Sequence, residues 1–201
     1  MLKGFRNSKV NESLRLPLSV SELGTLVSNI PKILVDKYMQ VLLEAMLVFS
    51  FFLGLRLGEM TDSVHNLHIS DIAVCNDTIK VNFKSFKHSK APSTHLLKAT
   101  NLFPCPYNTL MSYLRLRKPA PGPLFLLNNK AVSGRFFSKQ FKLILESSGF
   151  NSNNYSPHSL RISAAKMWAS KGLSDAQIRL LGRWQSNAFK NYLKGAVVHS
   201  E

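Results

Sequence analysis

Residues 156–192 have the sequence SPHSLRISAAKMWASKGLSDAQIRLLGRWQSNAFKNY, which carries three helix-start signals in succession. Ser156-Pro157 is typical of an N-cap followed by proline at the first helical position. The spacing Ser174-x-x-Gln177 is a capping-box pattern and predicts a second helix. Gly182 is expected to end that helix, and Ser186 is placed to cap a third. The stretch therefore predicts three helices around which the remaining chain is organised.

The same stretch carries four side chains that suit a phosphate-sized anion. His158 and Arg161 are three residues apart, so they share one face near the electropositive start of their helix. Trp184 offers an indole N–H and Tyr192 a phenol. Each of these residues alone is more often a capping or packing residue. The prediction of a site depends on their combination.

Upstream, an arginine follows a nearly continuous apolar run. Residues 37–54 predict a mostly buried helix that Asp36 caps, and Arg56 comes directly after its end. Arginine is seldom buried without a partner. Glu59 lies three residues further on and starts a short helix through about Val64. Arg56 is therefore a candidate site residue. The alternative is that Arg56 lies at the helix end, pairs locally with Glu59 and neutralises the helix dipole.

The hydrophobic period then changes to that of strands. Residues 69–74 and 78–83 alternate and are separated by a turn, and a third strand is expected near residues 95–98. Between the second and third strands lie Lys84, Lys87 and Lys90. The simpler interpretation of these lysines is a solvated loop that protects the sheet against aggregation.

The remaining pattern is helical. Helices are expected over residues 20–29, ending at Pro31, and over residues 107–117 and 134–148, with a short strand or loop end at 124–127. The fold class is therefore α+β, predominantly helical, with a small three-stranded antiparallel sheet. We expect one domain over residues 17–201, preceded by a basic linker over residues 1–16.

Composition restricts the partners. The 201 residues carry a formal net charge of +15, which favours nucleic acid or an anionic membrane surface as the partner. Cys75 and Cys105 form neither a disulfide framework nor a zinc-ligand spacing, so a reducing, intracellular compartment is the default. The N-terminus lacks the apolar region of a signal peptide, and the apolar run over residues 45–55 is too short to span a bilayer.

These motifs, in this order, resemble the tyrosine recombinase/phage-type integrase family. The resemblance extends from about Gly4 to Lys194 and is greatest to recombinases of eukaryotic mobile elements of the Crypton and DIRS-like kinds. The family pattern is an arginine, a hairpin lysine, H-x-x-R, a histidine or tryptophan, and a nucleophilic tyrosine. The matching residues are Arg56 in GLRLGEM, Lys87 in SFKHSK, His158 and Arg161 in HSLR, Trp184 in LGRW, and Tyr192 in KNYL.

The resemblance implies DNA strand transfer without a metal ion or another cofactor. Tyr192 would attack the scissile phosphate, which forms a 3′-phosphotyrosine and releases a 5′-hydroxyl. Arg56 and Arg161 would hold the non-bridging oxygens with planar, permanently charged groups. His158 is expected to act as the general base or as a donor to the phosphate, and Lys87 as the general acid.

Some assignments stay open. In the family a histidine usually lies nine residues before the tyrosine, whereas here Arg183 holds that place and Trp184 is eight residues before. We assign the role to Trp184, which would donate its N–H to the phosphate, with Arg183 as a residue that shares or supports it. Glu59 is expected to orient the site. Lys84 and Lys90 are alternatives to Lys87.

The expected partner is double-stranded DNA, with no membrane. Synapsis in the family implies a homotetramer on two duplexes, and a monomer in isolation is compatible with the sequence. We expect the family's N-terminal DNA-clamping domain to be absent from this sequence. A nuclear location is expected if the organism is eukaryotic.

The alternatives to a recombinase are a catalytically silent DNA-binding module derived from a mobile element and, with less support, a type IB topoisomerase-like activity. Beyond the catalytic set, the candidate DNA contacts are Lys84, Lys90, Arg135 and Lys139.

Overall fold

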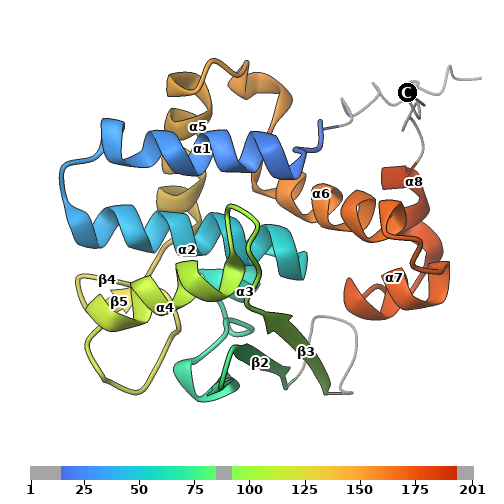
Figure 1. The fold of residues 1–201 in the computed structure, drawn as a ribbon, viewed down its shortest axis with the longest axis horizontal. Coiled ribbons are helices and arrows are strands. Elements are labelled where there is room, and N and C mark those ends of the chain that lie inside the picture. The colour runs from blue at the N-terminus through green and yellow to red at the C-terminus, as the bar shows by residue number, and fades with distance from the viewer. Residues whose placement is uncertain (1–14, 85–91, 194–201) are drawn as a thin grey trace, which may run out of the picture.

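The computed structural model describes residues 15–84 and 92–193. Its helices are α1 (Val20–Ile33), α2 (Lys37–Leu53), α3 (Leu57–Met60), α4 (Pro106–Leu116), α5 (Gly134–Ser147), α6 (Pro157–Ser170), α7 (Asp175–Leu181) and α8 (Lys190–Leu193). Its strands are β1 (Ile72–Cys75), β2 (Thr78–Phe83), β3 (Ser93–Lys98), β4 (Leu126–Leu127) and β5 (Lys130–Ala131). The α+β, predominantly helical fold with a small antiparallel sheet is therefore confirmed (Figure 1).

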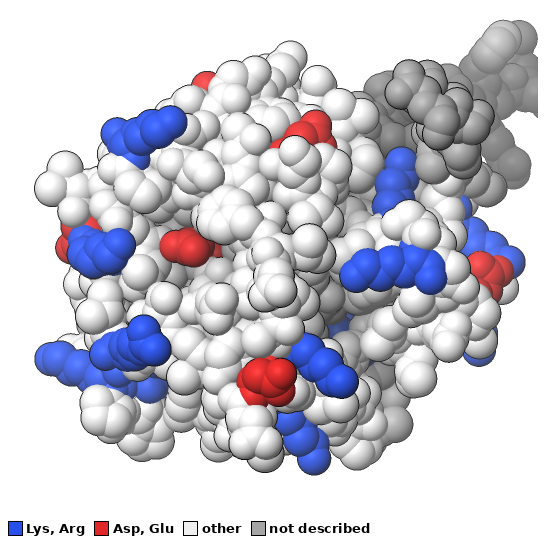
Figure 2. Space-filling model, viewed as in Figure 1, with Lys and Arg blue, Asp and Glu red and all other residues white. Residues whose placement is uncertain are grey.

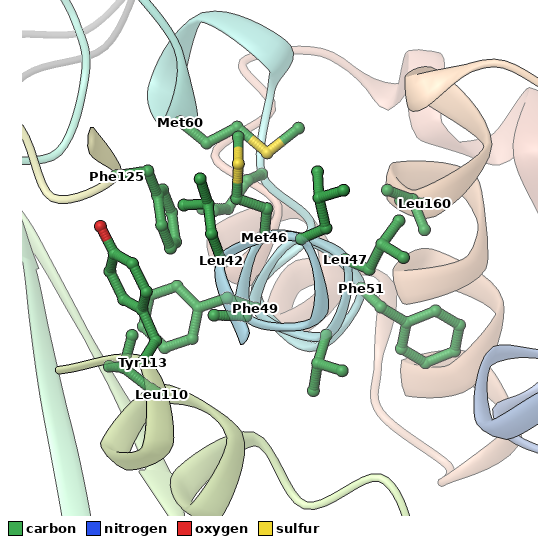
Figure 3. Close-up of a cluster of buried hydrophobic side chains, with 14 of the residues drawn as sticks. Leu42, Met46, Leu47, Phe49, Phe51, Met60, Leu110, Tyr113, Phe125 and Leu160 are labelled. Atoms are coloured by element: carbon green, nitrogen blue, oxygen red, sulfur yellow. The ribbon is translucent and has the colours of Figure 1, made fainter. Parts of the chain in front are cut away.

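Helix α2 is the centre of the core. Asp36 caps it by accepting a hydrogen bond from the Met39 amide at 2.9 Å. Gly54 ends it in the left-handed conformation, with φ of 57°, which glycine adopts without steric cost. Helices α1, α4 and α6 pack around α2. Figure 3 shows α2 end-on among buried side chains, of which those labelled are Leu42, Met46, Leu47, Phe49, Phe51, Met60, Leu110, Tyr113, Phe125 and Leu160.

The three-stranded sheet has the order β1-β2-β3, with both pairs antiparallel. Asn76, at φ of 50°, makes the tight turn between β1 and β2. Alternate residues of β2 are buried, namely Ile79, Val81 and Phe83. In β3, His95 is buried and pairs in register with Val81. The period-2 alternation thus directs a histidine to the inner face.

The C-terminal helices pack on α6 through a second, smaller hydrophobic cluster. Its buried members are Ala164, Ala165, Trp168, Ile178 and Phe189. Phe189 is fully buried and stands three residues before Tyr192. Burial of an aromatic side chain of this size contributes about 1.5–3 kcal/mol, so Phe189 anchors the tyrosine-bearing segment to α6.

Three boundary predictions were wrong. Pro31 does not end α1, which continues to Ile33. A proline there removes one hydrogen bond in the last turn, and burial of Ile30 holds that turn in place. The first strand was predicted to begin at residue 69, but residues 69–71 form a 3₁₀ turn, in which the Asp71 carboxylate accepts a hydrogen bond from the His68 amide. The helix that contains Glu59 ends at Met60 and does not reach Val64.

Among the described helices, none combines the length and the apolar character needed to cross a membrane.

Candidate active site

A cleft of about 770 Å³ opens where the end of α2, the start of α6 and the C-terminal helices meet, and we call it the Tyr192 cleft. Five of the six residues predicted to be catalytic line it. Its lining residues are Leu55, Arg56, Leu57, Ser156, Pro157, His158, Arg161, Trp184, Gln185, Ser186 and Tyr192. Segments more than 130 residues apart in the chain therefore supply one cleft.

The phenol and the imidazole are in direct contact. Tyr192 Oη lies 3.0 Å from His158 Nε2, with the two rings edge to face at 5.3 Å between centroids. Loss of hydration at the cleft wall, and then the charge of Arg161, lower the pKa of His158 below its usual 6.5. The lowered pKa favours the neutral ring, which in the tautomer with Nε2 unprotonated can accept a hydrogen bond from the phenol.

Arg161 is buried at the floor of the cleft. Its guanidinium donates to the carbonyls of Gly54 and Gly182 and lies 4.3 Å from the centre of the Trp184 ring. Burial, and then the charges of Arg56 and Arg183, lower the pKa of Arg161 to about 9. It stays charged at neutral pH, and its hydrogen bonds to these two carbonyls use only two of its five N–H donors.

Arg56 stands at the rim and is held by two acceptors. Its guanidinium donates to Glu59 Oε1 at 3.0 Å and to the Arg183 carbonyl at 2.6 Å. Its backbone N–H also donates to Glu59 Oε2 at 2.7 Å, at the start of α3. About a quarter of the Arg56 side chain is exposed, on the side that lines the cleft.

Glu59 is the buried counter-ion of the cluster. Its carboxylate pairs with Arg56 and with Arg183, whose Nη2 lies 2.7 Å from Oε2. Burial alone would raise the pKa of Glu59, but Arg183, the Arg56 amide and Arg161 lower it to about 2. Three guanidiniums and one carboxylate leave this part of the protein with two net positive charges.

Arg183 and Trp184 are adjacent in sequence but lie in different surroundings. Arg183 is buried against Glu59 and away from the cleft, whereas Trp184 lines the cleft and packs against Phe189 and Tyr192 at 5.5 and 6.0 Å between ring centroids. A Cβ at Gly182 would lie 1.6 Å from a ring carbon of Trp184. Glycine at position 182 is therefore required for this placement of the tryptophan.

The predicted lysines are not all placed. Lys87 and Lys90 lie outside the described residues. Lys84 lines a separate small pocket of about 190 Å³, and its Nζ pairs with Asp71 Oδ1 at 2.7 Å. Arg135 and Lys139 are exposed on α5 and are not among the residues that line the Tyr192 cleft. On the face of the molecule shown in Figure 2, basic side chains form separate groups, and acidic side chains lie beside several of them.

Phe83 and His95 complete the buried surroundings of this cluster, and no motif had marked either of them as a functional residue. The Arg183 guanidinium lies 4.0 Å from the centre of the Phe83 ring, which in turn meets the His95 ring edge to face at 5.1 Å. The signal that was present is the strand alternation, which places both residues on the inner face of the sheet. No group of three or more His, Cys, Asp or Glu side chains in the described ranges is arranged to hold a metal ion.

His95 is expected to make the protein less stable in mild acid. Burial, and then the charge of Arg183, lower its pKa from 6.5 to about 4. The unfolded chain therefore binds more protons than the folded chain between these values, so stability present above pH 6.5 falls as the pH drops toward 4. The difference corresponds to about 3 kcal/mol. Urea unfolding at about pH 7 and about pH 5 should show about 2 kcal/mol of this loss, which is complete only below about pH 4.

A His95→Gln variant serves as the comparison, because glutamine does not titrate. Its unfolding free energy should depend less on pH over the same interval, although His158, whose pKa is also lowered, keeps part of the slope in both proteins. Equal slopes in the two proteins would show that His95 is not the group concerned.

No family model matches the chain, and no curated protein matches it by sequence. Solved structures do match its fold. The chain is similar to a XerH site-specific recombinase in a post-cleavage complex with palindromic difH substrate, at 20% identity over 92% of this chain and 51% of that one, with a TM-score of 0.71. The similarity to XerA recombinase is 20% identity over 95% of this chain and 61% of that one, with a TM-score of 0.68. The chain is also similar to a lambda integrase dimer bound to a COC′ core site, at 14% identity over 97% of this chain and 51% of that one, with a TM-score of 0.66.

The fold of the chain is that of tyrosine recombinase catalytic domains. The chain spans about half the length of the XerH and lambda integrase chains that it matches.

Proposed function

We propose that the chain is the catalytic domain of a site-specific DNA recombinase or integrase that cuts and rejoins DNA through a 3′-phosphotyrosine intermediate. The observation that carries the proposal is the phenol of Tyr192 at 3.0 Å from the imidazole of His158, in a cleft lined by Arg56 and Arg161. The XerH and lambda integrase structures with the same fold contain bound DNA, which supports DNA as the partner.

The charges of the cleft suit the reaction. A phosphodiester attacked by a phenolate passes through a transition state with two negative charges spread over the phosphoryl oxygens. The cluster of Arg56, Arg161, Arg183 and Glu59 has two net positive charges. Preorganised charge of this kind stabilises the transition state without reorganisation during the reaction.

The steps balance as two phosphoryl transfers. In the first, Tyr192 Oη gives its proton to His158 and forms a bond to phosphorus, while the bond from phosphorus to the 5′-oxygen breaks. The leaving 5′-oxygen takes a proton, which we assign to Lys87. In the second, a DNA 5′-hydroxyl gives its proton to Lys87 and forms a bond to phosphorus, while the bond from phosphorus to Tyr192 Oη breaks and His158 returns the proton to that oxygen. The bond energy is conserved in the covalent intermediate.

The remaining parts of the proposal concern organisation. Residues 17–201 form the catalytic unit, residues 1–16 act as a basic linker, and synapsis uses four copies on two duplexes. The motifs FFLGLRLGEM and LGRWQSNAFKNYL favour a Crypton or DIRS-like mobile element as the source and, with it, a nuclear location. Lys84, Lys90, Arg135 and Lys139 are proposed to contact the DNA backbone.

Covalent trapping tests the proposal. The protein is incubated with nicked duplexes of randomised sequence, in which cleavage lets the short end diffuse away and prevents religation. We expect adducts that survive SDS, enriched for particular sequences, with the DNA-linked peptide containing Tyr192. DNA binding without any adduct would contradict strand transfer and indicate a binding module. Relaxation of supercoiled plasmid without site preference would indicate a topoisomerase.

A further inference from the structure

The guanidinium of Arg183 makes all of its hydrogen bonds inside the protein. Nε and Nη2 donate to the two oxygens of Glu59 at 3.2 and 2.7 Å. Nη1 donates to the carbonyls of Leu53 and Leu181, and Nη2 also donates to that of Gly54, at 3.0 to 3.3 Å. A guanidinium has five N–H donors, so none is left for a phosphate.

Glu59 is equally saturated. Its Oε1 accepts from Arg56 and Arg183, and its Oε2 accepts from the Arg56 amide and from Arg183. The backbone carbonyl of Arg183 also accepts from Arg56 Nη2 at 2.6 Å. Arg183 is therefore connected to Arg56 in two ways. Both guanidiniums donate to the Glu59 carboxylate, and the backbone carbonyl of Arg183 accepts directly from Arg56.

The flat side of the guanidinium is occupied as well. Phe83, the last residue of β2, lies beneath it at 4.0 Å, and His95 of β3 packs against Phe83. Arg183 thus fixes the segment between α7 and α8 to the sheet. A guanidinium enclosed between a carboxylate and an aromatic ring has little freedom to turn toward the cleft.

The backbone conformation explains why the side chains of Arg183 and Trp184, although adjacent in sequence, point into different surroundings. Arg183 has φ of 54°, in the left-handed region that non-glycine residues seldom adopt, at a cost of about 1–2 kcal/mol. This conformation lets the side chain of Arg183 enter the core while that of Trp184 lines the cleft. The strain is retained because Glu59 holds the side chain of Arg183, while Phe189 and Tyr192 pack against that of Trp184.

We infer that Arg183 is a positioning residue, which sets the guanidinium of Arg56 through Glu59 and its own carbonyl, and not a ligand of the scissile phosphate. The inference rests on the proposed function, because the property it explains is the rate of DNA cleavage. It also assigns the tryptophan, and not the arginine, as the residue of the Gly-Arg-Trp sequence that faces the DNA.

Single-turnover cleavage at saturating DNA tests the inference. Arg183→Met should slow cleavage by about 100-fold through misplacement of Arg56, with the DNA dissociation constant changed by less than about threefold. Arg183→Lys should remain slow, because an ammonium cannot form two parallel bonds to Glu59. Arg179→Met, which removes an exposed arginine on α7, is the matched control and should cleave at the wild-type rate.

The double variant separates positioning from direct contact. If Arg183 acts through Arg56, then Arg56→Ala/Arg183→Met should be no slower than Arg56→Ala alone. Multiplied rate losses would mean that the two arginines contact the phosphate independently and would overturn the inference, as would a wild-type rate in Arg183→Met.

A measurement on the unsubstituted protein remains decisive if the Arg183 variants do not fold. The Nε–Hε signal of Arg183 in an NMR spectrum should be protected from exchange and should shift little when DNA binds, whereas that of Arg56 should move. A large DNA-induced shift confined to Arg183 would overturn the inference. Absence of adducts in the wild type would instead contradict the proposed function, and the NMR comparison would still report on Arg183.

Discussion

Tyr192→Phe is expected to abolish SDS-stable DNA adducts and to leave DNA binding within about twofold of the wild type. Phenylalanine keeps the ring that packs against Trp184 but lacks the oxygen that attacks phosphorus. The variant also loses the hydrogen bond to His158, which costs about 1 kcal/mol of stability at a partly exposed position. Gel analysis of trapped adducts, with binding measured in parallel, checks both expectations.

Tyr107→Phe is the matched control for this experiment. Its hydroxyl donates to the Asn76 carbonyl at 2.8 Å, away from the Tyr192 cleft. The control therefore removes one phenolic oxygen and one hydrogen bond and should form adducts as the wild type does. Adducts that persist in Tyr192→Phe would place the nucleophile on another residue.

Much of the fold follows from local signals in the sequence. Ser174 and Ser186 mark helix starts as predicted, and each side chain accepts an amide hydrogen bond there. Ser156 is also an N-cap residue, but its side chain makes no cap hydrogen bond. The alternation over β2 gives that strand its observed bounds. The errors arose where a tertiary contact decided the outcome, as at Pro31, where a buried neighbour carries the helix past the proline.

The composition of the cleft was more predictable than its internal geometry. Motif order and spacing predicted five site residues that line one cleft, namely Arg56, His158, Arg161, Trp184 and Tyr192. Their roles remain predictions. Spacing did not decide between Arg183 and Trp184. That choice is made by the backbone conformation at residue 183 and by the close approach of Trp184 to Gly182, neither of which the order of residues specifies.

Glu59→Gln is expected to destabilise the protein by about 3–5 kcal/mol. The side chain of Arg183 is fully buried, and Glu59 is its counter-ion at 2.7 Å. Glutamine is neutral, and its amide N–H₂ would face guanidinium donors where a carboxylate oxygen now accepts. Arg183 would then be a buried charge without compensation, near the charges of Arg56 and Arg161. Urea unfolding at neutral pH measures the loss.

The pH dependence gives an independent check on this expectation. The pKa of Glu59 is lowered to about 2 in the folded protein, so its contribution to stability is present above its unfolded value of about 4.5 and is lost as the pH falls toward 2. Glu59→Gln has no such group. Its unfolding free energy should therefore change less than that of the wild type over this interval.

Two further variants distinguish a buried ion pair from a general effect of charge. Glu146→Gln removes an exposed pair with Lys142 at 3.8 Å and should cost less than about 1 kcal/mol. Glu59→Gln/Arg183→Met should be more stable than Glu59→Gln alone, because the second substitution removes the uncompensated charge. A double variant less stable than either single one would show that packing, and not charge, limits stability here. A stable Glu59→Gln that still cleaves DNA would mean that Arg56 keeps its position without the carboxylate.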